Sequence, residues 1–493
     1  MSVVKSLIAT SLAFGLVLLS GCEDDEPDTV APLISTLSHA DNDKVFGDRT
    51  ISFVATITDQ SDLSVEVTHN GNMQTVTTNT GANTFSASIT LEDDENNTIV
   101  VTATDSEGNS TTQSIALNYP YFRFTDGQNA SVVIGQPDFT SGAANQGGVA
   151  DANTIYQAEG RHIVINGVLY IADTRNNRIL GFNSVPTTAN AMADFVIGQP
   201  DFTTTTAGIA NNQLERPYTI ETDGTKFFVA MQGDVNQGRI HVWNSIPTSN
   251  VPADYVIGQP DFNQNDTNTC TYNRIGNKAR DVFVINNKLM IADTTQNRVL
   301  VWDQIPENSN QPATFVLGQK SFTVCETNDD DGDGFEDSPT ASTFVKPQSI
   351  WTDGERLAIA DLGNFRALFW SNFPSQNAQP ADLVLGQDTM FTNEYYEPPV
   401  TSTKYHPYYL TSNGNQLFVA DRRFFRVLVW NSWPSSDNVA PDQVLGNNDF
   451  VTEVSAITQS TFSAALGLYL NNNQLFVSDF VTGGHRVLIF NSQ

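Results

Sequence analysis

A run of aspartates has the residue types and the spacing that hold a divalent cation. Its candidate acidic ligands are Asp329, Asp331, Asp333 and Asp337. The first three alternate along the chain, so their carboxylates can converge on one ion, and Gly334 permits the sharp turn that such a loop needs. Phe335 offers its backbone carbonyl, and Asp337 falls where a water-mediated ligand is common. The stretch therefore predicts a structural calcium site, and a solvated acidic loop is the alternative.

The same stretch departs from the EF-hand pattern in two respects. Thr340 stands where an EF-hand has its bidentate glutamate, and no flanking helices are evident. The stretch instead resembles the calcium loops of thrombospondin-type repeats or dockerins. We expect a weak site, with a dissociation constant on the order of 10⁻⁴ to 10⁻³ M, which suits the stiffening of an extracellular protein.

A second set of residues could bind a ligand or assist a reaction. These polar side chains stand near the beginnings of β runs that recur along the chain, and they are Arg161, His162, Tyr218, Arg280, Gln348, His406 and Tyr408. Arg, His and Tyr together suit an anionic ligand or a lyase, although diverging repeats also produce such a mixture by chance. The histidines lack the spacing of a metal set, and the sequence has neither a G-x-S-x-G elbow nor a phosphate-binding glycine loop. Binding is therefore favoured over catalysis.

The elements that position these residues come from an internal repeat. The heptapeptide VIGQPDF begins at Val133, Val196 and Val256, and its glycine recurs about every 60 residues to Gly446. In phase with it run two β segments around a polar turn, such as LYIADTRNNRILGFN, and one β run before them. Each period therefore holds four strands, a to d. The sixth period lacks strand d, and the extra copy at 132–136 can supply it. The pattern predicts a closed six-bladed β-propeller over residues 131–493, without exposed sheet edges at the joint.

The motif ADxxNxR within each b–c hairpin resembles the NHL-repeat propellers. That resemblance supports the fold but little of the function, because such propellers include sensor domains, protein-binding scaffolds and a few lyases or hydrolases. An acidic and a basic residue recur in nearly every hairpin, which favours an architectural ion pair over a catalytic one. The pairs are Asp173–Arg178, Asp293–Arg298, Asp361–Arg366, Asp421–Arg426 and Asp479–Arg486. The second blade departs, with Met231 at the acidic position and Gln232 or Asp234 as substitutes.

The antiparallel strand order predicts where a ligand would bind. The b–c turns and the long d-to-a connections share one face of the ring, which we call the long-loop face. Because these connections are irregular, binding is expected on that face. Cys270 and Cys325 both lie in such connections, and in an oxidising compartment they are predicted to form a disulfide that would pin the acidic loop.

The N-terminus is typical of an export signal. A short apolar stretch follows Lys5, and the sequence LSGC that ends at Cys22 resembles the bacterial lipobox. The resemblance implies a lipoprotein signal peptide at 1–21 and an acylated Cys22, followed by an acidic tether at 22–30. A secretory peptide with an incidental cysteine is the alternative. We expect a lipid-anchored protein of the bacterial cell envelope, with the outer membrane or cell surface favoured over the inner membrane.

The remaining segment, 31–119, consists of short alternating β runs that predict a β-sandwich. Its closing stretch VVTATDSEGNS resembles bacterial immunoglobulin-like domains, which suggests a spacer. The formal net charge of -31 excludes nucleic acid as a partner, because a phosphate backbone would be repelled. The sequence therefore predicts an anchored, calcium-stiffened propeller that binds a protein or glycan ligand. A lyase or hydrolase at the mouth of the channel is the alternative.

Overall fold

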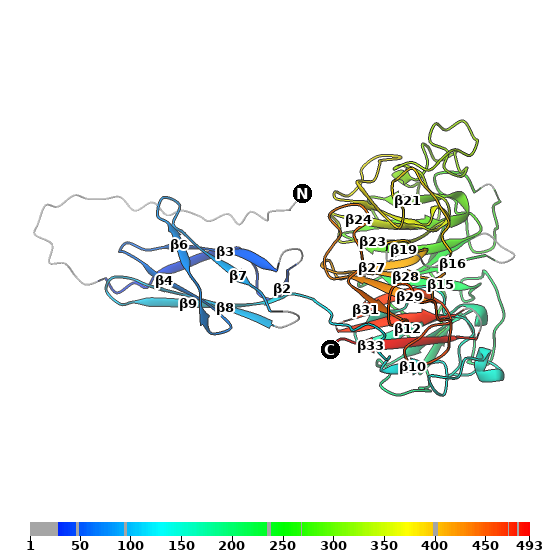
Figure 1. Cartoon of the computed structure of the whole chain (residues 1–493), viewed down its shortest axis with the longest axis horizontal. Helices are drawn as coiled ribbons and strands as arrows, with labels where there is room; N and C mark the ends of the chain where they lie inside the picture. The colour runs from blue at the N-terminus through cyan, green and yellow to red at the C-terminus, as the bar shows by residue number, and fades with distance from the viewer. Residues whose placement is uncertain are drawn as a thin grey trace, which may run out of the picture. The chain divides into compact units, whose positions relative to one another are not determined.

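The computed structural model describes residues 28–45, 49–92, 96–233, 238–267, 269–397, 403–471, 473–480 and 483–493 (Figure 1). The predicted signal peptide, Cys22 and most of the tether lie outside this part of the chain, as does Asp234. Within it, no helix has the length and hydropathy of a membrane span. The chain divides into two compact units, one made mostly of residues up to Leu117 and the other mostly of residues from Asn118 to Gln493.

The first unit is a β-sandwich. One sheet has the order β1 (Leu33–Leu37), β3 (Thr50–Thr58), β7 (Thr84–Thr90), β6 (Val76–Asn79). The other has the order β2 (Asp43–Lys44), β9 (Ser110–Asn118), β8 (Asn96–Thr104), β4 (Ser64–His69), β5 (Asn72–Met73). Alternate side chains are buried along the central strands, for example Phe53, Ala55 and Ile57 of β3. This period of two leaves each sheet one apolar face, which forms the core between the sheets.

The second unit is a six-bladed propeller of four-stranded antiparallel sheets, as the repeat predicted. Blade one comprises β11 (Ile163–Ile165), β12 (Val168–Asp173), β13 (Arg178–Phe182) and β14 (Phe195–Ile197), and blade two comprises β15 (Pro217–Thr222), β16 (Phe227–Met231), β17 (Arg239–Trp243) and β18 (Tyr255–Ile257). Blade three comprises β19 (Ala279–Ile285), β20 (Lys288–Asp293), β21 (Arg298–Trp302) and β22 (Phe315–Leu317), and blade four comprises β23 (Pro347–Thr352), β24 (Leu357–Asp361), β25 (Arg366–Trp370) and β26 (Leu383–Leu385). Blade five comprises β27 (Pro407–Ser412), β28 (Leu417–Asp421), β29 (Arg426–Trp430) and β30 (Gln443–Leu445).

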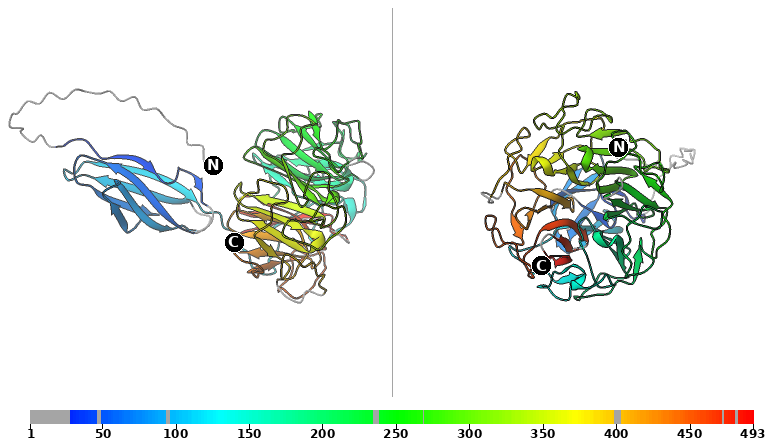
Figure 2. Two further views of the ribbon diagram at one scale, coloured as in Figure 1. Left: turned by 90° about the horizontal axis from the view of Figure 1, so that it is seen from above. Right: turned by 90° about the vertical axis from the view of Figure 1, so that its right-hand side faces the viewer.

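The ring closes in blade six, where the two ends of the repeat region meet. This sheet contains β31 (Ala465–Asn471), β32 (Gln474–Asp479) and β33 (Arg486–Asn491), and its outer strand is β10 (Val132–Ile134). Val133 pairs with Leu488 in antiparallel register. Figure 2 shows the colours passing around the ring until the first blade strand, in cyan, lies beside the last, in red. The predicted closure is confirmed, and the inner strands β11, β15, β19, β23, β27 and β31 surround a central axis.

Three residues of the heptapeptide, its glycine, glutamine and aspartate, have structural roles that explain their repetition. In the second copy, Gly198 has φ +88°, and a Cβ there would lie 2.6 Å from the side chain of Leu214. The amide of Gln199 donates to the backbone carbonyls of Asn177 and Thr206, both at 2.8 Å, which ties the b–c turn to the next connection. Asp201 then accepts the N–H groups of the two residues that begin the connection. The repeated sequence thus ends strand d and starts each long loop.

The recurrent Asp–Arg pairs are buried braces within the blades. In blade four, Arg366 Nε donates to Asp361 Oδ2 at 2.8 Å, and both side chains are fully buried. Arg366 Nη2 also donates to the carbonyls of Thr340 and Thr343, both at 2.9 Å. The guanidinium therefore ties the hairpin to the d-to-a connection. In the exceptional second blade, Met231 Sδ accepts the N–H of Glu215 at 3.3 Å, and Gln232 forms a β-bridge with Lys278.

A buried histidine makes the propeller sensitive to acid. His241 of β17 lies between Trp243 and Phe262, and neither ring nitrogen has a hydrogen-bond partner among the described residues. Burial lowers the pKa of His241 to about 3 from its ordinary value of 6.5. Between these two pKa values, the unfolded chain takes up a proton that the folded chain excludes. As the pH falls, the free energy of unfolding therefore decreases by up to about 1.4 kcal/mol per pH unit.

Replacing this histidine is expected to remove its share of that sensitivity. Between pH 6.5 and pH 5, the His241→Phe variant should lose about 1.6 kcal/mol less stability than the parent, because phenylalanine takes up no proton. Urea denaturation at the two pH values measures the difference. Parallel losses in parent and variant would show that His241 is already protonated in the folded chain.

Candidate functional site

The long-loop face contains a cavity at the mouth of the channel. Its volume is about 460 Å³, and its walls come from the beginnings of the inner strands, from b–c turns and from a d-to-a connection. The lining residues are Lys278, Arg280, Thr294, Thr295, Asn297, Thr327, Lys346, Gln348, Leu362, Tyr408 and Arg422. The cavity therefore lies on the face where the sequence predicted binding.

Three of the seven candidate residues, Arg280, Gln348 and Tyr408, line this cavity, and a fourth, Tyr218, is buried behind them. Arg280 Nη1 donates to the Tyr408 hydroxyl at 3.1 Å and to Glu159 Oε2 at 3.2 Å. The Tyr218 hydroxyl donates to that of Tyr408 at 2.9 Å, and the Arg280 guanidinium lies 4.5 Å from the centre of the Tyr218 ring. Burial raises the pKa of Tyr218 well above its ordinary value, so its hydroxyl stays protonated. Gln348 lines the same cavity.

Arg161 belongs to a separate buried network further along the inner strands. Its guanidinium lies 2.7 Å from Glu221 and 3.4 Å from Asp281, and it donates to the Val282 carbonyl at 2.6 Å. The Tyr409 hydroxyl donates to Asp281 at 3.0 Å. Burial raises the pKa of Glu221 to about 7 against the opposing effect of Arg161. These partners all contact the Nη2 end of Arg161, and its contacts are those of a brace between blades.

The two candidate histidines contact other groups. His162 Nε2 lies 2.8 Å from Ser478 Oγ, and burial lowers the pKa of His162 to about 3. The ring of His406 packs against Phe365 and Tyr395, at 4.6 and 4.7 Å between centroids, and burial lowers its pKa. His406 lines a second hollow of about 270 Å³ together with Leu362, Arg422, Arg423 and Phe425. The structure thus places His406 beside the cavity and gives His162 a partner in blade six.

Sequence reasoning missed three cations at the cavity. Lys278, Lys346 and Arg422 line it, and none of them forms an ion pair with a carboxylate in the described part of the chain. Arg422 lies over the ring of Tyr408, 5.1 Å from its centre. Lys278 and Lys346 each stand one residue before an inner strand, where blade two has Arg216 and blade five has His406. Comparison of this position between repeats could have found the two lysines.

Lys346 is held in place by the turn of the neighbouring blade. It has a left-handed conformation, φ 53°, directly before Pro347, which is unfavourable for a side-chain-bearing residue. Its N–H donates to Asn297 Oδ1 at 3.0 Å, and Asn297 Nδ2 donates to the Cys325 carbonyl at 3.1 Å. Cys325 in turn forms a disulfide with Cys270, with Cα atoms 6.1 Å apart. The disulfide, the turn and the lysine are therefore connected in series.

The acidic loop lies in the same connection as Thr327. Carboxylate oxygens of Asp329, Asp331 and Asp333 all lie within 4.8 Å of one another. Asp329 is buried and accepts the N–H groups of Gly332 and Gly334, at 2.6 and 2.9 Å. The two remaining predicted ligands are not part of this group of carboxylates. Asp337 accepts the N–H of Asp330 at 3.3 Å, and the side chain of Phe335 is exposed. Three of the predicted acidic ligands thus converge.

A second acidic group, which sequence reasoning missed, lies in the sandwich. Oxygens of Asp28, Asp59 and Asp105 lie within 4.8 Å of one another. Asn109 Nδ2 donates to Asp105 Oδ2 at 2.8 Å and to the Asp28 carbonyl at 2.7 Å. The three aspartates are far apart in the sequence, so no local motif marks them.

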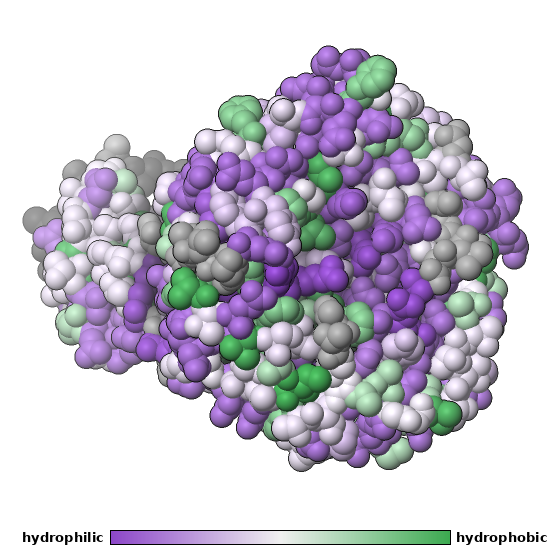
Figure 3. Space-filling view, turned by 45° about the vertical axis from the view of Figure 1, so that its right-hand side comes forward, coloured by the Kyte–Doolittle hydropathy of each residue, from purple (hydrophilic) through white to green (hydrophobic). Residues whose placement is uncertain are grey.

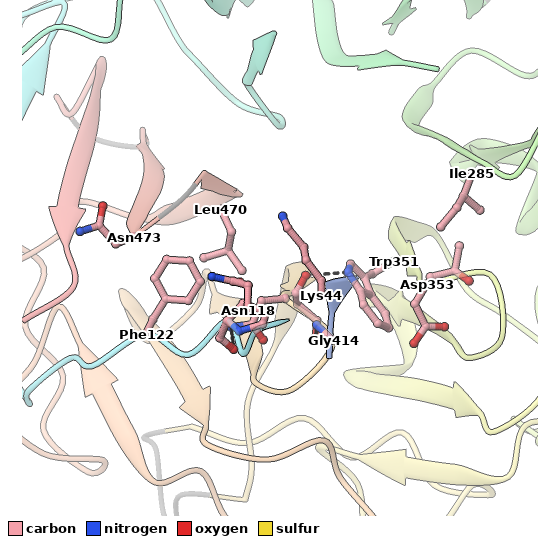
Figure 4. Close-up of a pocket in the computed structure, with 13 residues that line it drawn as sticks. Lys44, Asn118, Phe122, Ile285, Trp351, Asp353, Gly414, Leu470 and Asn473 are labelled. Carbon is pink, nitrogen blue, oxygen red and sulfur yellow. Dashed lines mark hydrogen bonds between the residues drawn. The ribbon is translucent and has the colours of Figure 1, made fainter. Parts of the chain in front are cut away.

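The opposite mouth of the channel has a different chemistry. It is lined by Ile285, Trp351 and Leu470, near the far ends of inner strands, and by Phe122 from the segment before β10 (Figure 4). Trp351 Nε1 donates to the Ser412 carbonyl at 2.8 Å, so the indole is fixed. None of the seven candidate residues lines this mouth. It therefore supplies control positions for experiments on the long-loop face.

Comparisons with known proteins give weak structural likenesses. No protein-family model and no curated protein matches the chain. A solved putative phosphatase from Bacteroides thetaiotaomicron is 12% identical over 94% of this chain and 98% of its own, with a TM-score of 0.43. An aldose sugar dehydrogenase from Streptomyces coelicolor, solved with bound PQQ, is 11% identical over 70% of this chain and 96% of its own, with a TM-score of 0.38. A quinoprotein alcohol dehydrogenase-like protein from Bacteroides thetaiotaomicron is 10% identical over 94% and 99%, with a TM-score of 0.32. The assignment of the propeller accordingly stands on the sheet order and the ring closure of this chain.

Proposed function

We propose that the propeller is a binding module of an envelope lipoprotein and that it takes a protein or glycan ligand at the long-loop mouth. The observation that carries this proposal is the cavity of about 460 Å³, a size common among ligand sites. Two buried polar atoms of residues that line it, Arg280 Nε and Gln348 Oε1, have no hydrogen-bond partner in the described part of the chain. Leaving such atoms unpaired costs free energy, which a bound ligand would recover.

A lyase or hydrolase at the same mouth is the second candidate, and the contact between Arg280 and Tyr408 favours it. A general base must lie within hydrogen-bond reach of the proton that it removes. His162 is bonded to Ser478, and the ring of His406 is packed among aromatic side chains. The geometry therefore supports binding better than acid–base catalysis.

A ligand screen tests the binding proposal. The full chain is screened against neutral saccharides, acidic saccharides and peptides by thermal shift, and each ligand found is titrated against the variant Gln348→Ala. Ile285→Ala, at the opposite mouth, is the control. Affinity should fall about tenfold in Gln348→Ala, because a hydrogen bond to a buried side chain is lost, and should stay unchanged in the control. If the affinity of a ligand falls only in Ile285→Ala, the binding site lies at the opposite mouth.

The membrane anchor is part of the same proposal and rests on the sequence around Cys22. Two or three acyl chains on this residue would hold the protein stably in a bilayer. Cell fractionation of Cys22→Ala tests it, since the variant should leave the membrane fraction. A variant that remains there would rule out the acyl anchor.

Calcium is the proposed occupant of the acidic loop. At about 10 mM calcium, the ion should raise the free energy of unfolding by about 1.4 kcal/mol if its dissociation constant is near the weak end of the structural range, about 10⁻³ M. The melting temperature should rise accordingly. The double variant Asp331→Asn and Asp333→Asn changes two exposed side chains and should lose this response. An equal shift in parent and variant would place the ion elsewhere, and no shift in the parent would argue against a site.

A further inference from the structure

We infer that the ligand of the long-loop mouth is an anionic sugar, with its acidic group bound by Lys278, Arg280 and Lys346 and its ring packed against Leu362 and Phe425. This inference rests on the proposed function, because it assigns a ligand class to the same site.

The cavity concentrates positive charge in a strongly acidic protein. The chain has 24 Lys and Arg residues against 55 Asp and Glu, yet Lys278, Lys346 and Arg422 line one cavity without a carboxylate partner among the described residues. Arg280 adds a fourth cation, which has only Glu159 as its ion-pair partner in that part of the chain. Burial lowers the pKa of Lys278, and the neighbouring cations Arg280, Lys346 and Arg216 lower it further against the opposing effect of Glu159. An anion at this point would relieve the mutual repulsion.

Two buried polar atoms specify more than a charge. Arg280 is 9% exposed and Gln348 is 4% exposed, and both line the cavity. Arg280 Nε is a donor and Gln348 Oε1 an acceptor, and each lacks a partner in the described residues. The donor suits an anionic oxygen, whereas the acceptor needs a hydroxyl or an N–H group. A sugar acid carries both an anionic oxygen and hydroxyl groups.

The other side of the mouth is apolar. The second hollow, of about 270 Å³, shares Leu362 and Arg422 with the cationic cavity and adds Phe425. Leu362 and Phe425 are partly exposed and pack against a core cluster that contains Tyr408 and Leu466. In Figure 3, strongly hydrophilic side chains gather near the middle of the face that this view brings forward, with smaller hydrophobic patches beside them. The C–H face of a sugar ring fits such a border, which a bare inorganic anion would leave uncovered.

Screening favours a short ligand over a long polyanion. At physiological ionic strength the Debye length is about 8 Å, so a molecule inside the cavity senses mainly the cations that line it. A long polyanion would extend over the rest of a protein with a net charge of -31 and be repelled there. The two adjoining hollows therefore favour a mono- or disaccharide-sized acid.

Three probes separate charge from ring shape. Digalacturonic acid supplies a carboxylate, its methyl ester supplies the same rings without charge, and glucose 6-phosphate supplies a phosphate instead. Calorimetric titration of the full chain should show binding of at least one anionic probe, and the ester should bind at least about tenfold more weakly than the acid. The two anionic arms distinguish a carboxylate from a phosphate as the preferred group.

Matched lysine variants locate the contact. Lys278→Met and Lys346→Met should each lower the affinity for the anionic probe about tenfold. This loss of affinity should be smaller at high salt. The control is Lys226→Met, which removes the same charge from a partly exposed a–b turn on the opposite face, where Lys226 Nζ contacts Asn244 at 3.3 Å. Its affinity should equal that of the parent.

The outcomes separate this inference from the binding proposal. Equal affinity for acid and ester, with both lost in Gln348→Ala, would overturn the anionic assignment and leave the long-loop mouth as the ligand site. If the probes bind Lys278→Met, Lys346→Met and Gln348→Ala as tightly as the parent, both the anionic assignment and the long-loop mouth as the ligand site would be wrong. If no probe binds at about 10 mM, far above the working range of specific sites, the anionic-sugar assignment is wrong, whatever the ligand screen finds.

Discussion

Replacing Arg366 by methionine is expected to lower the free energy of unfolding by about 3 to 5 kcal/mol, because Asp361 would be left buried without its cation. Both side chains are fully buried, and Nε lies 2.8 Å from Oδ2. The same change removes the donors to Thr340 and Thr343, so the hairpin would also lose its tie to the long connection. Denaturation by urea at constant pH measures the loss.

Two controls make this result interpretable. Lys288→Met removes a cation from an ion pair with Asp303, whose side chains are 29% and 49% exposed, and should cost less than about 1 kcal/mol. The double variant Asp361→Leu with Arg366→Met should recover part of the loss, since no buried charge remains unpaired. A cost for Arg366→Met as small as that for Lys288→Met would contradict the buried brace.

Removing the disulfide is expected to cost about 4 kcal/mol, because the bond closes a loop across a sequence separation of 55 residues and restricts the unfolded chain. The variant replaces Cys270 and Cys325 by serine together, so that no free thiol remains. Ligand affinity should also fall, since the Cys325 carbonyl holds Asn297 and Asn297 holds Lys346. Calorimetry well below the melting temperature measures this second effect apart from unfolding.

The variant Asn297→Ala provides the comparison for the disulfide. It removes the link between Cys325 and Lys346 and keeps the covalent bond, so it should weaken the ligand while costing much less stability. If the disulfide variant lost stability but kept full affinity, the serial connection from bond to lysine would be wrong.

Much of the propeller could be predicted from sequence because its interactions are local and repeated. The heptapeptide marks the outer strand, and the unpaired copy before blade one had to complete blade six. Gln136 Nε2 donates to the His485 carbonyl at 3.0 Å. The glutamine of the heptapeptide therefore holds the b–c turn in blade six as well, where the ring closes. Repetition also identified the Asp–Arg pairs as architecture, and in the structure both partners of these pairs are fully buried.

The candidate site was predicted less completely because it depends on side-chain direction and on contacts between distant blades. Arg161 and His162 are adjacent residues directly before β11, yet their side chains have different partners, because His162 contacts Ser478 of blade six. Arg161 instead meets Glu221 and Asp281, residues far away in the chain. Lys278 and Lys346 stand at a position before the inner strands that varies between blades, with Arg216 in blade two and His406 in blade five, so the repeat pattern did not mark them.

The location of the ligand is tested most directly by hydrogen exchange of the full chain with and without the tightest ligand from the screen. We expect slower exchange at the backbone amides around Lys278 to Arg280, Lys346 to Gln348 and the turn after Asp421, all at the long-loop mouth. Slower exchange confined to the opposite mouth, around Ile285, Trp351 and Leu470, would contradict the proposed binding site.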